Sequence, residues 1–185
     1  MSKPARLTIL CEDLQQACFV RRFLMNRGWT RYDLYEKIAP AGRGSGQQWV
    51  RAQFPRELRA YRSKRGHLRN GLVAVLDADR REVADILRDL NAACDEQKVP
   101  PKRPDERVLI IVPKRNIETW FAHLRGEVVD EESAYERYSF ESQCHRDADR
   151  LDTVCRQESP CEIGLPPSLT RCCSDFRRFW RDLQP

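Results

Sequence analysis

Three short apolar segments, each followed by polar residues, constrain the fold of this chain most strongly. The clearest runs from Leu72 to Leu76 and is followed by Asp77-Ala78-Asp79. A strand covered on both faces has this continuously apolar composition, because neither set of alternating side chains meets water. Similar segments run from Leu7 to Cys11 and from Val108 to Val112. The sequence therefore predicts a sheet that is buried on both faces.

Helical patterns separate these strands. The strongest spans Arg80 to Glu96, where apolar residues recur on one helical face. Another follows the first strand and stops near Gly28, and a third spans 47–61, broken or begun again at Pro55. Residues 32–38 alternate as a further strand. Alternating strands and helices predict an α/β, Rossmann-like fold, with a mainly parallel sheet of about four strands and helices on both faces.

The pattern changes after Gly126. Residues 1–126 are expected to form the α/β domain, and residues 127–185 a helical C-terminal extension that packs on it. Helices are predicted at about 133–156 and at 168–183, the second docked by aromatic side chains. A length of 185 residues fits one domain with a small appendage.

Carboxylates follow the predicted strands. Glu12 ends the first, Asp77 and Asp79 end the central one, and the segment after Val112 carries Lys114 and Glu118. The carboxyl ends of parallel strands meet at one edge of the sheet, where ligands bind. Gathered carboxylates repel one another unless a cation lies among them, and Mg²⁺ or Mn²⁺ prefers such oxygen ligands. We expect a metal site, and a metal ion there could polarise a phosphoryl oxygen and generate hydroxide from bound water.

Plainer interpretations of these residues remain open. The first three carboxylates would also fit strand-end turns in which Asp79 caps the following helix. Glu118 is favoured in a first helical turn by the helix dipole alone. Lys114 would also fit a solvated surface charge.

A strand ending in Glu12, followed by a helix and by a later strand ending in Asp77-Ala78-Asp79, resembles the Toprim domain of topoisomerases, primases and OLD-family nucleases. The segment Ile111 to Phe121, IVPKRNIETWF, is similar to a stretch of OLD-related standalone Toprim proteins. The resemblance covers roughly residues 6 to 124. It implies a Toprim-like nuclease of a two-component phage-defence system, working with a separate ABC- or SMC-type ATPase.

The resemblance also implies roles for the site residues. Glu12 would be a metal ligand or proton-transfer group, and Asp77 and Asp79 would be metal ligands. Glu118 would bind a second metal ion, and Lys114 would stabilise charge in the transition state.

A basic segment suggests a nucleic-acid partner, DNA or RNA. The chain carries a formal net charge of +5, and aromatic residues alternate with arginines between 43 and 69. The arginines expected to contact phosphate are Arg43, Arg51, Arg59, Arg62 and Arg65. A solvated helix face explains them equally well.

The chain has no recognisable signal peptide and no apolar run of membrane-spanning length, so a cytoplasmic protein is expected. Its eight cysteines are therefore interpreted as reduced thiols. Those near the C-terminus, with one histidine, could close a zinc site, but we expect free, buried thiols because no CxxC pair is present. This set is Cys144, His145, Cys155, Cys161, Cys172 and Cys173.

Two rival functions remain open. The fold could serve as a non-catalytic module that binds nucleic acid or a partner protein, and a metal-binding assay would separate this from an enzyme. A receiver-like phospho-acceptor domain would use Asp77 with Lys114, but leaves Glu118 and the arginines unexplained. The sequence does not show whether the chain forms a homo-oligomer.

Overall fold

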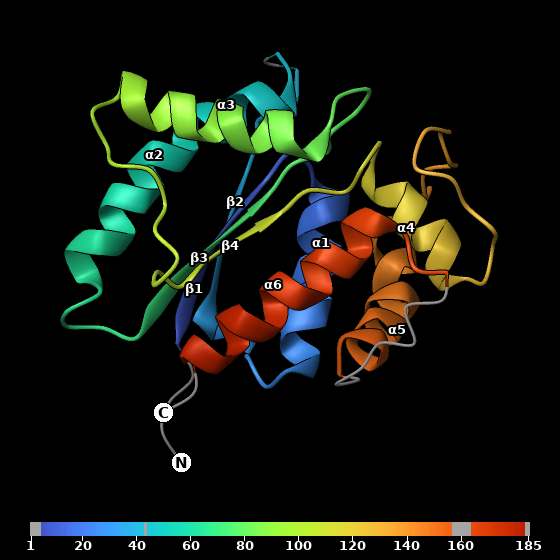
Figure 1. Ribbon diagram of the computed structural model, residues 1–185. Helices are drawn as coiled ribbons and strands as arrows, with labels where there is room; N and C mark the ends of the chain where they lie inside the picture. The colour runs from blue at the N-terminus through green and yellow to red at the C-terminus, as the bar shows by residue number, and fades with distance from the viewer. Residues whose placement is uncertain (1–4, 43, 157–163, 184–185) are drawn as a thin grey trace.

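The computed structural model describes residues 5–42, 44–156 and 164–183. Within them four strands form one sheet: β1 (Arg6–Cys11), β2 (Leu34–Ile38), β3 (Asn70–Val75) and β4 (Val108–Ile111). Every neighbouring pair is parallel, in the order β2-β1-β3-β4 (Figure 1). The predicted α/β, Rossmann-like architecture with a parallel sheet of about four strands is confirmed.

Helices cover both faces of the sheet. The α-helices in the described part of the chain are α1 (Leu14–Asn26), α2 (Gly46–Lys64), α3 (Val83–Glu96), α4 (Ile117–Leu124), α5 (His145–Arg156) and α6 (Pro167–Leu183). Short 3₁₀ helices, η1 (Arg31–Asp33) and η2 (Glu141–Cys144), accompany them. Helices α2 and α3 pack on one face, and α1, α4, α5 and α6 on the other (Figure 1).

Strand β3 shows why the central apolar segment is continuous. Leu72 and Ala74 belong to the core beneath α2 and α3, whereas Val73 and Val75 belong to the core on the opposite face. All four side chains are fully buried. Both alternating sets of side chains therefore contribute to a hydrophobic core, as predicted for a strand in a parallel sheet.

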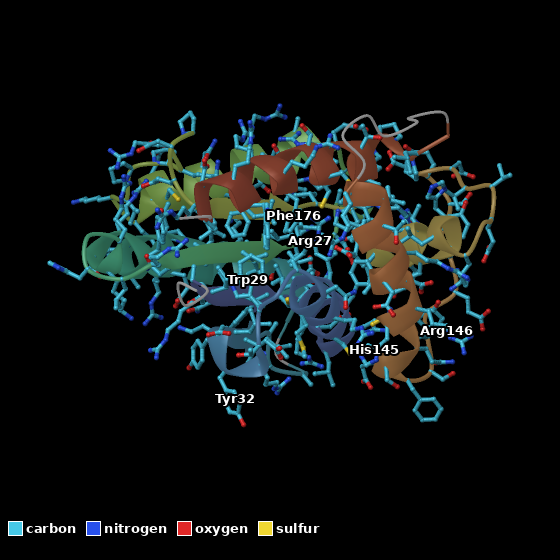
Figure 2. All side chains as sticks on the ribbon, turned by 90° about the horizontal axis from the view of Figure 1, so that it is seen from below. Arg27, Trp29, Tyr32, His145, Arg146 and Phe176 are labelled. Carbon is cyan, nitrogen blue, oxygen red and sulfur yellow. A yellow bond between two sulfur atoms is a disulfide. The ribbon has the colours of Figure 1, made fainter. Side chains whose placement is uncertain are left out.

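The last two helices complete the second core. Phe176 of α6 packs on Phe23 of α1, with ring centroids 4.5 Å apart. The Arg27 guanidinium lies over the Phe23, Phe176 and Trp180 rings and forms an ion pair with Asp152 of α5 (Figure 2). Aromatic residues dock α6, as the sequence indicated.

Two helix predictions need correction. Helix α2 continues without a break through Pro55, because Phe54, Leu58 and Tyr61 bury one of its faces beside the sheet and this packing outweighs the missing N–H. The helix predicted from residue 133 begins only at His145. The Asp130 carboxylate accepts hydrogen bonds from the backbone N–H groups of Glu132 and Ser133, a local turn that competes with helix.

The prediction that all C-terminal cysteines are free thiols is wrong. Cys155 of α5 and Cys173 of α6 form a disulfide, and their Cα atoms are 5.0 Å apart. The two helices pack side by side, which is a tertiary arrangement that the sequence spacing does not reveal. Cys144 and Cys172 are buried free thiols. Cys161 lies outside the described residues.

Candidate metal centre

The candidate site lies where the strand order reverses. The chain passes from β1 outward to β2 and then crosses to β3 on the other side of β1. In open α/β sheets this switch point leaves a crevice beyond the carboxyl ends of the two central strands. Glu12 directly follows β1, and a single residue, Leu76, separates Asp77 from the end of β3. The fold therefore delivers both carboxylates to the same edge of the sheet, at this switch point.

Glu12 and Asp77 are in direct contact. The Asp77 backbone N–H donates a hydrogen bond to Glu12 Oε1 at 2.7 Å. The Asp77 Oδ1 atom is buried and has no hydrogen-bond partner. A buried carboxylate oxygen without a donor is costly, and a cation is one way to satisfy it. These hard oxygen donors fit a divalent ion such as Mg²⁺.

The N-terminus of α2 forms one wall of the site. A Cβ atom on Gly46 would lie 2.7 Å from Glu12 Cβ and 2.9 Å from the Glu12 carbonyl oxygen, so only glycine fits. The next residue, Gln47, donates from Nε2 to the Asp77 carbonyl oxygen at 2.7 Å. The glycine-rich sequence that ends at Gly46 indicates a close approach of the backbone, for which a phosphate is the expected neighbour, whereas the structure places Glu12 there. Sequence reasoning missed Gln47.

Glu118 lies in the first turn of α4 and is only 6% exposed. Its Oε1 accepts a hydrogen bond from Gln15 Nε2 at 2.7 Å. Asp13 caps α1 and pairs with Arg137 at 2.6 Å, and the Arg137 Nε lies 4.0 Å from Glu118. The structure thus adds Asp13, Gln15 and Arg137 to the surroundings of the predicted carboxylates.

The carboxylates repel one another. Burial and the charge of Glu12 are the leading causes that raise the pKa of Asp77 well above its ordinary value, with Glu118, Asp13 and Asp79 adding to them. Burial raises the pKa of Glu12 to about 7, although the hydrogen bond from the Asp77 N–H lowers it. Burial also raises the pKa of Glu118. The cluster would be stabilised by added positive charge.

Asp79 lies at the margin of the site. Its side chain is exposed, and its backbone adopts a left-handed conformation with φ of 53°. The Asp79 N–H donates to the Arg115 carbonyl at 2.7 Å, which ties the loop after β3 to the loop after β4. Helix α3 begins at Val83 with Glu82 at its N-cap, so the alternative in which Asp79 caps that helix is wrong.

The Lys114 ammonium is engaged by neighbouring groups. It donates to Glu82 Oε1 at 2.6 Å and to the Arg81 carbonyl at 3.1 Å, and it lies 3.5 Å from Glu132. These contacts raise the pKa of Lys114. A receiver-like site requires a lysine beside the acceptor, here Asp77. The partners of Lys114 are instead Glu82, Glu132 and the Arg81 carbonyl.

In the part of the chain that the structure describes, no three His, Cys, Asp or Glu side chains are placed so that they could hold one ion together. Mg²⁺ commonly takes one or two protein carboxylates and keeps several waters. Glu12 and Asp77 together would provide that smaller number of carboxylates.

The predicted nucleic-acid-binding arginines of α2, and Arg65 directly after it, contact other parts of the protein. Arg62 forms two hydrogen bonds to the buried Glu106 carboxylate at 2.7 and 2.9 Å, and Arg65 pairs with Asp105. Arg51 pairs with Glu96, and Arg59 donates to the Gln97 carbonyl. These contacts dock α2 onto α3 and the segment before β4. Arg43 lies outside the described residues.

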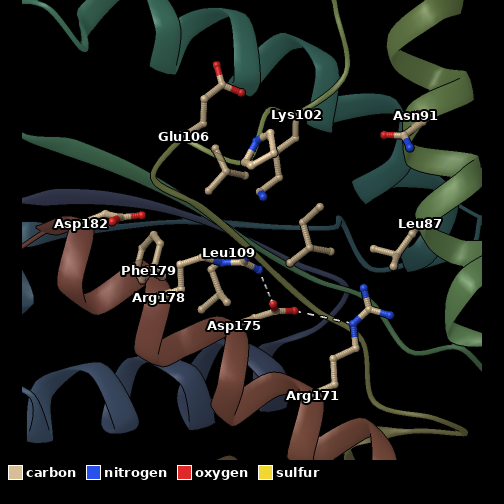
Figure 3. Close-up of a pocket in the computed structure, with 13 residues that line it drawn as sticks. Leu87, Asn91, Lys102, Glu106, Leu109, Arg171, Asp175, Arg178, Phe179 and Asp182 are labelled. Atoms are coloured by element: carbon tan, nitrogen blue, oxygen red, sulfur yellow. Dashed lines mark hydrogen bonds and ion pairs between the residues drawn. The ribbon is translucent and has the colours of Figure 1, made fainter.

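A hollow of about 230 Å³ lies along β4 between α3 and α6 (Figure 3). Leu87, Lys102, Arg178 and Phe179 are among the residues that line it, and the predicted metal-site residues are not. Asp175 on its α6 wall pairs with Arg171 and Arg178. The hollow is thus separate from the carboxylate cluster.

Among the residues that the structure describes, no helix has both the length and the apolar composition needed to span a membrane. Comparison of the chain with models of known families, with curated proteins and with solved structures gave no match.

Proposed function

We propose that this protein is a Mg²⁺- or Mn²⁺-dependent phosphodiesterase that cleaves nucleic acid, DNA or RNA, at the crevice between β1 and β3. The observation that carries the proposal is the buried, unpartnered Oδ1 of Asp77 beside Glu12 at the switch point of the sheet. A site that gathers carboxylates and leaves one oxygen without a donor is arranged for a cation.

Glu12 and Asp77 would hold the ion, and Glu118 and Asp79 would complete its surroundings or hold a second ion. A bound divalent ion supplies positive charge to a phosphoryl oxygen and lowers the pKa of a coordinated water. Gln15 and Gln47 position the site through their hydrogen bonds to Glu118 and to the Asp77 carbonyl. Lys114 would bind a substrate phosphate after giving up its ion pair with Glu82, whose side chain is 72% exposed.

The same features support the Toprim resemblance. Glu12 and Asp77-Ala78-Asp79 follow adjacent parallel strands, as the resemblance requires. We therefore also propose that the protein is a cytoplasmic, OLD-like nuclease component of phage defence, and that a separate ABC- or SMC-type ATPase controls it.

The direct test combines Mn²⁺ binding, measured by calorimetry, with cleavage of circular DNA and of RNA. Asp77→Asn and Glu12→Gln keep the side-chain shape but remove the charge. Each should abolish Mn²⁺ binding and lower the cleavage rate by a hundredfold or more, roughly the effect of losing a direct ligand or general base. The matched control is Asp95→Asn, because Asp95 is exposed on α3. If both site variants bind Mn²⁺ and cleave like the control, the proposal is wrong.

A non-catalytic nucleic-acid- or partner-binding module is the second candidate. The absence of a three-ligand group among the described residues favours it. It predicts that the wild-type protein binds nucleic acid or a partner without binding Mn²⁺. Calorimetry of the wild-type protein therefore separates the two candidates before any variant is made.

A further inference from the structure

A second cluster of reactive groups lies between α1 and α5, around Cys18. The Cys18 Sγ atom is 3.2 Å from His145 Nε2. The Arg21 guanidinium donates a hydrogen bond to the same sulfur at 3.4 Å. An imidazole that can take a proton, together with a nearby positive charge, is the environment that favours the nucleophilic thiolate form of cysteine.

A second free thiol completes this cluster. Cys144 directly precedes His145. Burial is the leading cause that raises the pKa of its thiol, and Cys18 lies close enough to raise it further. Both thiols are free, and η2, which ends at Cys144, packs against α1. Two free cysteines on elements that pack together meet the first geometric requirement for a disulfide, which remote cysteines do not.

The cluster also has access to solvent. His145 lines an open hollow of about 600 Å³, together with Arg125, Arg146 and Arg150. Figure 2 labels His145 and Arg146 of α5. Cys18 is 5% exposed, whereas Cys144 is fully buried behind it. A reagent would meet Cys18 first. The hollow is lined by three arginines and one carboxylate, that of Asp147, and this excess of positive charge would favour a reagent that carries negative charge.

We propose that Cys18 and Cys144 form a redox-active dithiol that reacts with small disulfides bearing carboxylates. Cys18 is the attacking thiol, and Cys144 resolves the mixed disulfide. The site is distinct from the carboxylate crevice, and it does not depend on the proposed nuclease activity.

The reaction is an ordinary thiol–disulfide exchange. His145 Nε2 takes the proton of Cys18, and the thiolate attacks one sulfur of the small disulfide, RSSR. The sulfur–sulfur bond breaks, and the first RS⁻ leaves and is protonated. Cys144 then loses its proton and attacks Cys18 Sγ, expelling the second RS⁻, which is also protonated. The protein dithiol is oxidised to a disulfide, and RSSR is reduced to two RSH.

This bond would fix both ends of α5. The disulfide between Cys155 and Cys173 already joins the C-terminal end of α5 to α6. A bond between Cys18 and Cys144 would join the N-terminal end of α5 to α1.

The test uses the folded, full-length chain with Cys161→Ser, because Cys161 lies outside the described residues. The protein is treated with oxidised glutathione, quenched with acid, alkylated and mapped by mass spectrometry. We expect a Cys18–Cys144 linkage and loss of two hydrogens, with Cys11, Cys94 and Cys172 still alkylated. In a Cys144→Ser variant the reaction should stop at glutathione bound to Cys18.

Two further arms test the roles of His145 and of the arginines. His145→Gln should slow the reaction about tenfold or more, as expected for loss of a general base. The reaction rate of the protein with each disulfide is divided by the rate of a free cysteine peptide with the same disulfide. This ratio should be lower for neutral hydroxyethyl disulfide than for oxidised glutathione. Added salt should reduce the difference between the two ratios. Unreacted Cys18 in the folded protein, or equal labelling of Cys18 and Cys94, would overturn the proposal. Equal relative rates for the two disulfides would overturn the selection for carboxylates.

Discussion

The surroundings of Glu12 disfavour the ionised form of its carboxyl group. Burial is the largest cause of its raised pKa of about 7, and the charges of Asp79 and Asp13 add to it. The ordinary value is 4.5, so folding favours the protonated carboxyl. The stabilisation is complete at pH values below about 4.5 and is lost as the pH rises through about 7. In metal-free protein, ionised Glu12 is therefore a destabilising group.

The raised pKa of Glu12 predicts a dependence of stability on pH that the substitution Glu12→Gln removes. In the presence of a chelator, the wild-type free energy of unfolding should fall relative to that of Glu12→Gln between pH 4.5 and pH 7.5, by on the order of 2 to 3 kcal/mol. Urea unfolding at several pH values measures the difference. Saturating Mn²⁺ should stabilise only the wild-type protein. A difference that does not change with pH would show that Glu12 is solvated.

At the level of single residues, sequence predicted the carboxylates better than their neighbours. Glu12 and Asp77 come together because each follows a recognisable buried strand. Gln15 forms a hydrogen bond with Glu118, which lies 103 residues later in the chain. Arg137 pairs with Asp13, which lies 124 residues earlier. Such contacts depend on how the helices pack, and no local pattern encodes them.

Helix α2 is positioned by a contact at its first residue. Gly46 lies against Glu12 with no room for a methyl group. Gly46→Ala should destabilise the protein by about 1 to 3 kcal/mol, the usual result of overpacking, and should weaken Mn²⁺ binding by displacing Glu12. Gly66→Ala is the matched control, because nothing lies within 4 Å of its would-be Cβ and its φ is not positive. Thermal unfolding and calorimetry report the two effects, and equal behaviour of the two variants would contradict this account.

The other end of α2 is held by a buried ion pair. The Glu106 side chain is fully buried, and hydrogen bonds from Arg62 and from the Arg103 N–H help to lower its pKa, although burial alone would raise it. Arg62→Ala leaves this carboxylate with weaker partners and should cost about 2 to 4 kcal/mol.

The control for Arg62 is Arg59→Ala, which removes an exposed hydrogen bond to the Gln97 carbonyl and should cost less than about 1 kcal/mol. Chemical unfolding of both variants tests the comparison. If the Arg62 variant is as stable as the Arg59 variant, the ion pair does not hold α2 in place.

Elements with strong periodicity were predictable, and those that depend on tertiary packing were not. The strands and helices α1, α3 and α6 lie close to their predicted positions. Pro55 predicted a break in α2, but side-chain packing keeps the helix continuous. The charged residues after 127 suggested a helix, but Asp130 instead stabilises a turn. The basic periodicity of α2 suggested a nucleic-acid surface, although Arg62 is used to neutralise Glu106.

The whole molecule depends on how firmly α5 and α6 are joined to the sheet. The Cys155–Cys173 disulfide closes a loop with a sequence separation of 18 residues. Constraining a loop of that size in the unfolded chain stabilises the fold by about 3 kcal/mol. Reductant should therefore lower the unfolding midpoint of the wild-type protein and leave that of a Cys155→Ser/Cys173→Ser variant unchanged. Equal midpoints for oxidised and reduced wild-type protein would contradict the prediction.

The contact between Glu12 and Asp77 joins residues separated by 65 positions in the chain. Contacts of such long range form late, because a large loop must close before they contribute any free energy. The crevice cannot exist on a growing chain until β3 has emerged and paired with β1, and its Arg137 boundary is added later still. Under the proposed function, a nascent chain would carry the acidic residues well before it carries the assembled site, so the order of synthesis would delay any action on nucleic acid.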